Sequence, residues 1–172
     1  MRHTFCEKCA SRLTDREIGG AKRQVCPQCG SIVYEHSRPC AGALVVDRGC
    51  VLLVKRAVDP FKGYWDIPGG FLEAGEHPAA GAARELLEET GLSIEPIEVV
   101  GLFVDEYGAD KIPTLSIVYH ARVKSGTARA ASDASEVRWF ALDQLPDKLA
   151  FPWSRQAIDA LIRILQDRST RH

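Results

Sequence analysis

The residues best suited to chemistry lie in one stretch, residues 70–92, where glutamates recur at fixed spacings after a glycine turn. Its middle part has helical periodicity, so Glu85, Glu88 and Glu89 fall at i, i+3 and i+4 on one face of a predicted helix. Like charges at this spacing destabilise a helix unless a cation neutralises them, and clustered hard oxygen ligands suit Mg²⁺ or Mn²⁺. The pattern indicates a divalent-metal site, with a solvated acidic helix face as the alternative.

The helix that must carry these acids is predicted over residues 78–90. Pro78 suits a first helical position and Gly91 suits the residue after the last turn, whereas His77 is a weak N-cap. Gly81 costs about 1 kcal/mol relative to alanine, which suggests that another group approaches the backbone there. The face opposite the acids is predicted to be buried and consists of Ala79, Ala80, Ala83, Leu86 and Leu87.

The flanking sequence supplies the other elements of a mixed α/β fold. Strands are expected at residues 41–47, 50–55, 98–104, 115–123 and 137–140, with a short apolar segment at 64–67. Ser154 is expected to cap a final helix that has an apolar stripe. Together these elements predict a sheet packed between helices.

Four of the six cysteines form two Cys-x-x-Cys pairs that are separated by 16 residues. These are Cys6 and Cys9, then Cys26 and Cys29. The spacing predicts a structural Zn²⁺ site with four thiolates, and a redox pair is the alternative. A module this short buries little apolar surface, so the metal would hold it together. Cys40 and Cys50 are expected to be small buried residues.

Charge and composition limit the partners that we expect. Residues 1–36 carry a net charge of +2, which four thiolates and one Zn²⁺ would bring to about zero, so this module is expected to be structural rather than to bind nucleic acid. The whole chain of 172 residues has a formal net charge of −1 and has no apolar run long enough to cross a membrane. No secretory signal is evident, so a cytoplasmic location is expected.

The complete spacing in residues 70–92 matches a known motif. It reads glycine, five residues, glutamate, seven residues, arginine and glutamate, an aliphatic residue, any residue, two glutamates, any residue, glycine and an aliphatic residue. This pattern resembles the Nudix box and departs from it at no position. The resemblance implies an α/β/α sandwich with a mixed sheet, here residues 37–172 after a zinc ribbon at 1–36. It also implies hydrolysis of the pyrophosphate bond of a nucleoside diphosphate linked to another group, and a homodimer as the family habit.

The resemblance assigns roles to individual residues. Glu76 would support the site, and Arg84 would orient a glutamate through paired hydrogen bonds, with a plain surface ion pair as the alternative. The general base would be Glu85 or, as in several Nudix enzymes, an acid on a loop before a late strand, here Asp133 or Glu136. The implied ligands of the catalytic Mg²⁺ are the Gly70 carbonyl and the carboxylates of Glu85, Glu88 and Glu89.

A zinc ribbon before a Nudix domain resembles two arrangements. Bacterial NADH pyrophosphatase carries a Ser-Gln-Pro-Trp-Pro-Phe-Pro array, which residues 100–123 of this chain lack. A short zinc-ribbon group acts on FAD and ADP-ribose, and the segments RPCAGALVV and AFPWS are similar to that group. We therefore expect a dinucleotide or ADP-ribose as substrate. The aromatic residues that could stack on its adenine are Phe61, Tyr64, Phe103, Tyr107, Phe151 and Trp153, and we take Phe61, Tyr64 and Phe103 as the substrate-binding candidates. The alternatives are a house-cleaning nucleoside triphosphate hydrolase and a nucleotide sensor without catalysis.

Overall fold

The computed structural model describes residues 2–170, and the chain divides into two compact units between Ser37 and Arg38. The first unit is a three-stranded antiparallel sheet in the order β1-β2-β3. Its strands are β1 (Thr14–Ile18), β2 (Ala21–Val25) and β3 (Ile32–Val33). Each unit has its own hydrophobic cluster, and the cluster of the first is formed around Cys6, Leu13 and Cys26.

The two Cys-x-x-Cys segments of the first unit fold into matching turns. The N–H of Cys6 donates to the Ser11 carbonyl, and the N–H of Cys26 donates to the Ser31 carbonyl, each at 2.8 Å. The four sulfur atoms lie within 4.8 Å of one another, with Cys9 Sγ 3.4 Å from Cys26 Sγ. This arrangement fits the predicted zinc ribbon, because four convergent thiolates are the usual ligands of structural zinc.

We expect Cys26→Ser to abolish stoichiometric zinc binding and to unfold residues 2–37, because zinc binding supplies much of the folding free energy of such small modules. The substitution should leave hydrolysis unchanged, since the clusters that form the core of the second unit contain no ribbon residue. Metal analysis and limited proteolysis would measure these effects. The matched control is Cys50→Ser, because Cys50 is half-buried and lies outside the four-sulfur group. The Cys50→Ser protein should bind zinc as the parent does.

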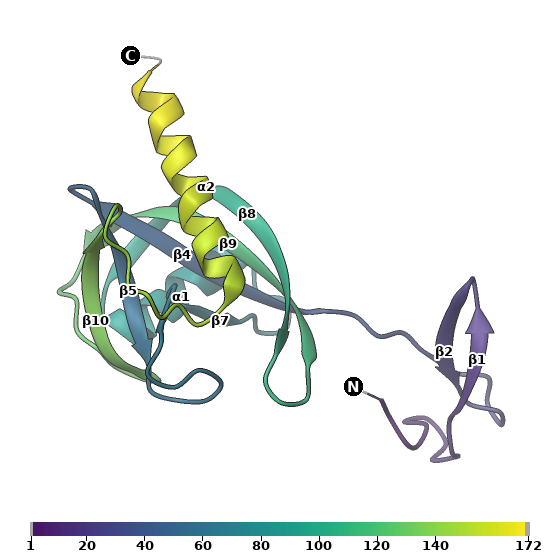
Figure 1. Cartoon of the computed structure of the whole chain (residues 1–172). Helices are drawn as coiled ribbons and strands as arrows, with labels where there is room; N and C mark the ends of the chain where they lie inside the picture. Colours follow the sequence, from purple (N-terminus) through teal and green to yellow (C-terminus); the bar gives the residue numbers. More distant parts are fainter. Residues whose placement is uncertain (1, 171–172) are drawn as a thin grey trace. The chain divides into compact units, whose positions relative to one another are not determined.

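The second unit is built on a seven-stranded sheet (Figure 1). Five strands run in the order β10-β5-β4-β9-β8, while β6 pairs with β5 and β7 pairs with β4. The pair β4–β9 is parallel and the other pairs are antiparallel, so the sheet is mixed. The strands are β4 (Arg38–Asp47), β5 (Cys50–Arg56), β6 (Trp65–Asp66), β7 (Gly69–Phe71), β8 (Ser93–Tyr107), β9 (Ile112–Ser125) and β10 (Ala134–Ala141).

Two helices cover the opposite faces of this sheet, as Figure 1 shows. Helix α1 (Pro78–Thr90) packs Ala82 and Leu86 against Val45 and Leu52 of the sheet. Helix α2 (Pro152–Ser169) packs its apolar stripe on the other face, against side chains such as Leu44 and Leu53. The predicted sandwich is thereby confirmed, because each helix buries one apolar face against the sheet.

Several sequence-based details differ from the structure. Strands β8 and β9 extend well beyond the expected limits, because they pair with each other along nearly their whole length. Helix α2 begins at Pro152, and Ser154 does not cap it: its buried hydroxyl donates to Asp66 instead. On α1, Ala80 and Leu87 are exposed, whereas Glu89 is buried. No helix in residues 2–170 is long and apolar enough to cross a membrane.

Candidate active site

The acids of α1 are held in place by well-defined helix ends. His77, despite its weak propensity, caps the first turn by accepting the N–H of Ala79 at Nδ1, over 3.2 Å. Gly91 ends the helix in a left-handed conformation with φ of 70°, and its N–H donates to Leu87. Because both ends are fixed and Leu86 is fully buried, the direction of each acidic side chain is set by the helix rotation.

Gly70 lies directly against the Glu85 carboxylate. Strand β7 pairs with β4, so that Gly70 faces Ala41 and Gly69 faces Gly42. A Cβ atom added to Gly70 would lie 2.6 Å from Glu85 Cδ and Oε1. The absence of a side chain at Gly70 therefore lets the backbone lie against this acid, while its expected role as a carbonyl ligand of a metal stays a prediction.

Arg84 links three acids of the motif. Its Nε and Nη2 donate to the two oxygens of Glu76 over 2.8 and 2.9 Å, forming a bidentate pair. Its Nη1 donates to Glu85 over 2.8 Å and lies 3.4 Å from Glu88 Oε2. Glu76 also accepts the N–H of Glu73, so it anchors the loop before α1. Arg84 therefore orients two glutamates rather than forming an isolated surface pair.

The Glu76–Arg84 pair leads to a pH-dependent prediction. The hydrogen bonds from Arg84 lower the pKa of Glu76 from 4.5 to about 2. A carboxyl group whose pKa falls on folding stabilises the native state above its unfolded pKa and loses this contribution as pH drops. We expect the melting temperature of Glu76→Gln to lie below that of the parent at pH 7 and to converge with it between pH 4.5 and about 2.

Thermal unfolding followed across this pH range would test the prediction. The control is Glu95→Gln, which removes another glutamate–arginine ion pair, the exposed one in which Arg122 Nε and Nη2 both donate to Glu95 Oε2. A pH-independent difference between Glu76→Gln and the parent would contradict the assignment. An equal, equally pH-dependent loss of melting temperature in Glu95→Gln and in Glu76→Gln would also contradict the assignment.

Glu89 is the most buried acid of the motif, with an exposed fraction of 6%. Its Oε2 accepts the N–H of Gly69 over 2.9 Å. Burial, together with the negative charges of Asp133 and Asp66, raises the pKa of Glu89 to about 9. A carboxyl group this strongly perturbed and close to other acids is typical of a functional site, and a bound cation would favour its ionised form.

The acids do not form one compact group. Within residues 2–170, the four ribbon cysteines are the only group of three or more potential metal ligands whose ligand atoms all lie within 4.8 Å of one another. The Glu88 side chain is 51% exposed, while Glu85 and Glu89 each keep a hydrogen bond to the protein. The oxygen donors therefore have the right chemistry for a divalent cation, but their side chains must move closer together to share one.

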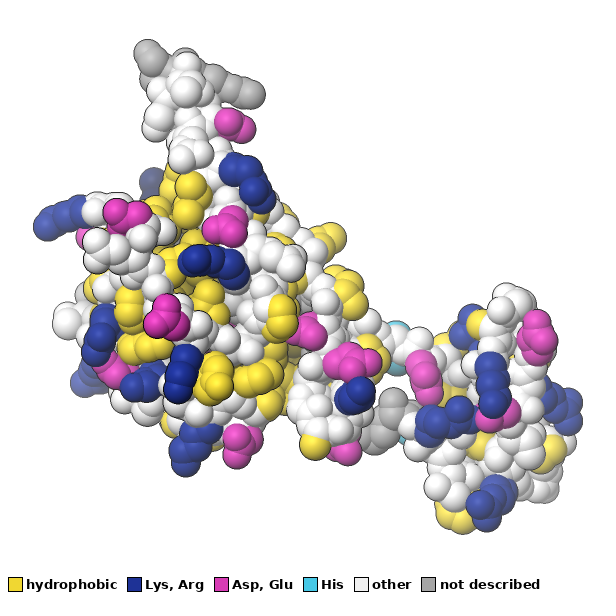
Figure 2. Space-filling model, in the orientation of Figure 1, with side chains coloured by type: hydrophobic (Ala, Val, Ile, Leu, Met, Phe, Trp, Pro, Cys, Tyr) yellow, Lys and Arg dark blue, Asp and Glu magenta, His cyan; other side chains and the backbone are white. Residues whose placement is uncertain are grey.

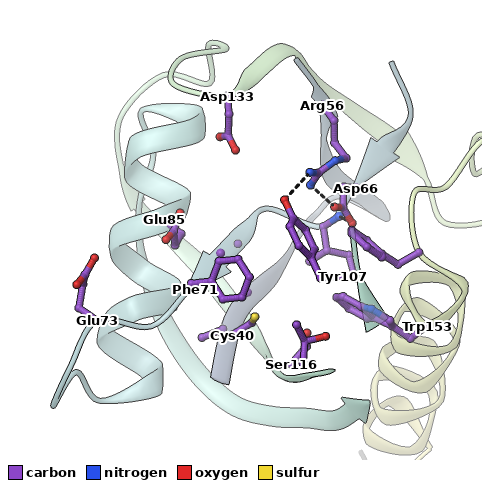
Figure 3. Close-up of a pocket in the computed structure, with 17 residues that line it drawn as sticks. Cys40, Arg56, Asp66, Phe71, Glu73, Glu85, Tyr107, Ser116, Asp133 and Trp153 are labelled. Atoms are coloured by element: carbon purple, nitrogen blue, oxygen red, sulfur yellow. Dashed lines mark hydrogen bonds and ion pairs between the residues drawn. The ribbon is translucent and has the colours of Figure 1, made fainter. Parts of the chain in front are cut away.

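A cavity of about 290 Å³ lies beside this group of acids (Figure 3). Glu85 and Asp133 lie at one end of it, and the β4 and β9 residues Cys40 and Ser116 lie toward its lower side in the figure. Four aromatic residues also line the cavity: Phe71, Tyr107, Phe151 and Trp153. An apolar wall beside a few polar groups is the usual form of a small-molecule site.

An arginine is fixed in the wall of this cavity. Arg56 donates from Nη1 to Asp66 over 3.2 Å, from Nη2 to the Tyr107 hydroxyl over 3.3 Å and from Nε to the Pro60 carbonyl over 2.6 Å. Its guanidinium also lies over the Phe151 ring, 5.5 Å from the centroid. These bonds use three of its five N–H groups, so two remain for a ligand. Burial raises the pKa of Asp66 to about 6, although the positive charge of Arg56 opposes this rise.

Residues 36–161 match the family known as the NUDIX domain. This chain belongs to the Nudix hydrolase family. The zinc-ribbon Nudix enzyme that the sequence predicted is thus confirmed at the level of family and fold, and residues 70–92 are its Nudix box. Family members use divalent metals, which agrees with the oxygen-rich end of the cavity.

Known relatives include proteins with different described activities. An ADP-ribose pyrophosphatase of Methanocaldococcus jannaschii is 35% identical over 119 residues, which are 69% of this chain and 70% of the relative. The NAD-capped RNA hydrolase NudC of Stutzerimonas stutzeri is 31% identical over 157 residues, or 91% of this chain. This Nudix hydrolase spans only 53% of the length of NudC.

A solved structure resembles the chain over almost its whole length. The crystal structure of a NUDIX hydrolase from Nitrosomonas europaea superposes with a TM-score of 0.80 at 29% identity. The match covers 98% of this chain and 93% of the other chain. The α/β/α sandwich with its mixed sheet is therefore the fold of this family.

The structure separates the predicted base candidates of this Nudix hydrolase. Asp133 lines the cavity together with Glu85, and its charge acts on both Glu85 and Glu89. Glu136 does not line the cavity and forms ion pairs with Lys55 and Arg138. Burial raises the pKa of Glu85, with Glu88 and Asp133 contributing and Arg84 opposing, which makes this carboxylate a stronger base.

Of the aromatic residues considered for stacking, Tyr107, Phe151 and Trp153 line the cavity, whereas the three selected candidates, Phe61, Tyr64 and Phe103, do not. Phe61 packs edge-on against Phe151 with centroids 5.2 Å apart and contacts Tyr64, and Phe103 stacks on Trp153 at 5.5 Å. Phe61 and Phe103 therefore each contact a wall residue without lining the cavity, and Tyr64 contacts Phe61. The wall residues themselves come from three separate segments of the chain. The sequence analysis did not identify Arg56, Asp66 or Phe71 as site residues. The signal that could have found the first two is a charged residue at the end of a short apolar strand, because Arg56 ends β5 and Asp66 ends β6.

Proposed function

We propose that this Nudix hydrolase cleaves the pyrophosphate bond of ADP-ribose or of a related dinucleotide, with Mg²⁺ or Mn²⁺, and releases a nucleoside monophosphate. The observation that carries this proposal is the composition of one cavity. Its one end has Glu85 and Gly70 in close approach, and its other end has a fixed arginine and an aromatic wall. Such a cavity can take a diphosphate at the acidic end and a ring system at the aromatic end.

The metal would be held by Glu85, Glu88 and Glu89, with the Gly70 carbonyl as a further ligand. Bound there, it would supply neutralisation of the diphosphate charge and activation of water. The close approach of Gly70 to Glu85 and the burial of Glu89 among other acids support this assignment, because hard oxygen donors suit such an ion. Arg84 would keep Glu85 oriented through its hydrogen bond while Glu76 holds the guanidinium.

Proton removal from the attacking water would be done by Glu85 or Asp133. Both carboxylates line the cavity, and the pKa of Glu85 is raised by burial and by neighbouring negative charges. Glu85 cannot easily serve as both base and metal ligand with the same oxygen, so Asp133 is the stronger candidate once an ion is bound. Its place beside Glu85 and outside the box agrees with this role.

The substrate base would lie against Tyr107, Phe151 and Trp153. These rings form a continuous stack, with centroid distances of 6.2 Å from Tyr107 to Phe151 and 5.9 Å from Phe151 to Trp153. The two N–H groups that Arg56 has left could donate to ring or ribose acceptors. The 35% identity to an ADP-ribose pyrophosphatase supports ADP-ribose as the first substrate to test.

A substrate panel with Mg²⁺ tests the proposal. ADP-ribose, FAD, NADH and a nucleoside triphosphate would be incubated with the protein, and the released phosphates would be identified. We expect AMP from ADP-ribose or from a dinucleotide. Pyrophosphate release from the triphosphate alone would favour a house-cleaning hydrolase, as in the putative 8-oxo-dGTP diphosphatase of Mycobacterium tuberculosis, which is 36% identical. Tight binding of ADP-ribose with no turnover would favour a sensor.

We expect Tyr107→Ala to raise KM for ADP-ribose about tenfold, because stacking on one base contributes about 1–3 kcal/mol. Tyr107→Phe keeps the ring and should restore most of the affinity, since only the bond to Arg56 is lost. Phe61→Ala is the matched control, because Phe61 is a neighbouring, partly exposed aromatic residue outside the cavity wall. If Phe61→Ala raised KM more than Tyr107→Ala did, the adenine would stack on Phe61 and not on Tyr107.

A further inference from the structure

The zinc ribbon separates its charges between the two faces of its small sheet. Paired residues of adjacent antiparallel strands point to the same face, and the register pairs Arg16 with Arg23 and Thr14 with Val25. It pairs Asp15 with Gln24 and Glu17 with Lys22 on the other face. The acids of β1 and β2 therefore all lie on one face, and the charged residues that these two strands place on the other face are Arg16 and Arg23. Glu35, which follows β3, lines a small pocket together with Arg23.

Tyr34, the residue that follows β3, extends the arginine row. The guanidinium of Arg23 lies over the Tyr34 ring, 4.7 Å from the centroid, and the Tyr34 side chain is 58% exposed. Arg16, Arg23 and Tyr34 therefore form one row across the sheet, which we call the arginine–tyrosine face. Figure 2 shows Lys and Arg side chains interspersed with Asp and Glu on the visible side of the ribbon.

This row is unfavourable for the ribbon alone. Like charges directly opposite each other on paired strands destabilise a sheet. On the acidic face, Asp15 pairs with both Arg2 and Lys22. Within residues 2–170, neither Arg16 nor Arg23 has an acidic partner of this kind. An anionic ligand that bridges the two guanidinium groups would remove the repulsion, and it would also fit the exposed ring beside them.

We propose that the arginine–tyrosine face binds single-stranded RNA or DNA. Two arginines one strand apart can contact successive phosphates, and a tyrosine stacked with an arginine offers a platform for one base. The ring favours a polynucleotide over an acidic polypeptide, because a carboxylate gains nothing from an aromatic surface. The near-zero charge of the whole ribbon is an average over two unlike faces, so it does not oppose this binding.

The experiment uses the full zinc-loaded chain and a short fluorescent oligoadenylate, followed by anisotropy at several salt concentrations. Each phosphate contact contributes about −0.7 to the slope of log K against log salt for single strands, so two contacts predict a slope of about −1.4. We expect Arg16→Gln with Arg23→Gln to weaken binding at least tenfold and to remove most of this slope. Tyr34→Ala should weaken binding about tenfold, and Tyr34→Phe should retain it.

The charge-matched control is Arg2→Gln with Lys22→Gln, which removes two positive charges from the acidic face. The change in log Kd that it causes should be less than half of the change caused by Arg16→Gln with Arg23→Gln. Zinc content and thermal unfolding confirm that each variant is folded. The proposal is overturned if the parent does not bind at low salt, or if the control weakens binding as much as the test variant. The proposal is also overturned, in favour of an acidic protein partner, by two results together. These are that poly-glutamate competes as effectively as RNA, and that Tyr34→Ala binds the oligonucleotide as tightly as the parent.

Discussion

Glu85→Gln is expected to lower kcat for pyrophosphate hydrolysis about a thousandfold, which corresponds to about 4 kcal/mol of transition-state stabilisation. Glutamine has nearly the same shape, so the hydrogen bond from Arg84 can persist through the amide oxygen. The substitution removes the one negative charge that lies both against Gly70 and in the cavity wall. The loss therefore reports on charge at the reacting end of the site rather than on packing.

Stability should not fall in the same variant. Burial raises the pKa of Glu85, so the folded state disfavours its charged form and neutralising it does not destabilise the protein. Initial rates with ADP-ribose at saturating Mg²⁺, together with a melting curve, would measure both quantities. Glu73→Gln is the matched control, because Glu73 lines the same cavity but is exposed and lies at its outer edge, apart from Glu85 and Asp133, in Figure 3. A kcat within tenfold of the parent for Glu85→Gln would rule out the proposed site.

Asp133→Asn separates the two candidate bases. If Asp133 removes the proton, this variant loses the acidic limb of the pH–rate profile, whereas Glu85→Gln lowers the rate at every pH. If Glu85 is the base, the acidic limb disappears in Glu85→Gln and is retained in Asp133→Asn. Both variants keep the fold-defining contacts of α1, so the comparison depends only on the chemistry of the two carboxylates.

Gly70→Ala is expected to lower kcat about a hundredfold with little loss of stability. The new methyl group would lie 2.6 Å from the Glu85 carboxylate, which is the far end of a flexible side chain and can move away. That movement displaces the acid and blocks access to the Gly70 carbonyl, and misplacement of about 1 Å can cost a hundredfold in rate. Steady-state kinetics and thermal unfolding would measure the two effects.

Two other glycines provide controls for this interpretation. Gly101→Ala also presses a methyl group against a movable side chain, the ring of Phe103 at 2.8 Å. This ring stacks on the wall residue Trp153 and lies away from the acids, so the variant should keep its kcat, with any effect confined to KM. Gly69→Ala would place a methyl group 2.5 Å from the Ala41 carbonyl in the paired strand, so the sheet itself must shift. We expect this last variant to lose about 3 kcal/mol of stability. Equal kcat values for Gly70→Ala and Gly101→Ala would contradict the proposed role of Gly70.

Local patterns in the sequence were sufficient for the helix and the zinc ligands. Helix α1 has the predicted bounds, Pro78–Thr90, because its periodicity, its proline and its final glycine act over a few residues. The four cysteines were predictable for the same reason, since each Cys-x-x-Cys turn is closed by its own backbone hydrogen bonds. The burial of Glu89 was not predictable in this way, because it depends on Gly69 and Asp133, which other segments bring to the helix.

The sequence by itself determined the family, the acidic helix and the pair of cysteine turns, because these features are encoded in spacings along one element. Only the tertiary structure decided which acids line the cavity, which aromatic residues form its wall and how the ribbon divides its charges. Phe71, Tyr107 and Trp153 meet because β7, β8 and α2 converge at one edge of the site. Strand pairing and register fix such meetings, and they depend on long-range packing that no local spacing records.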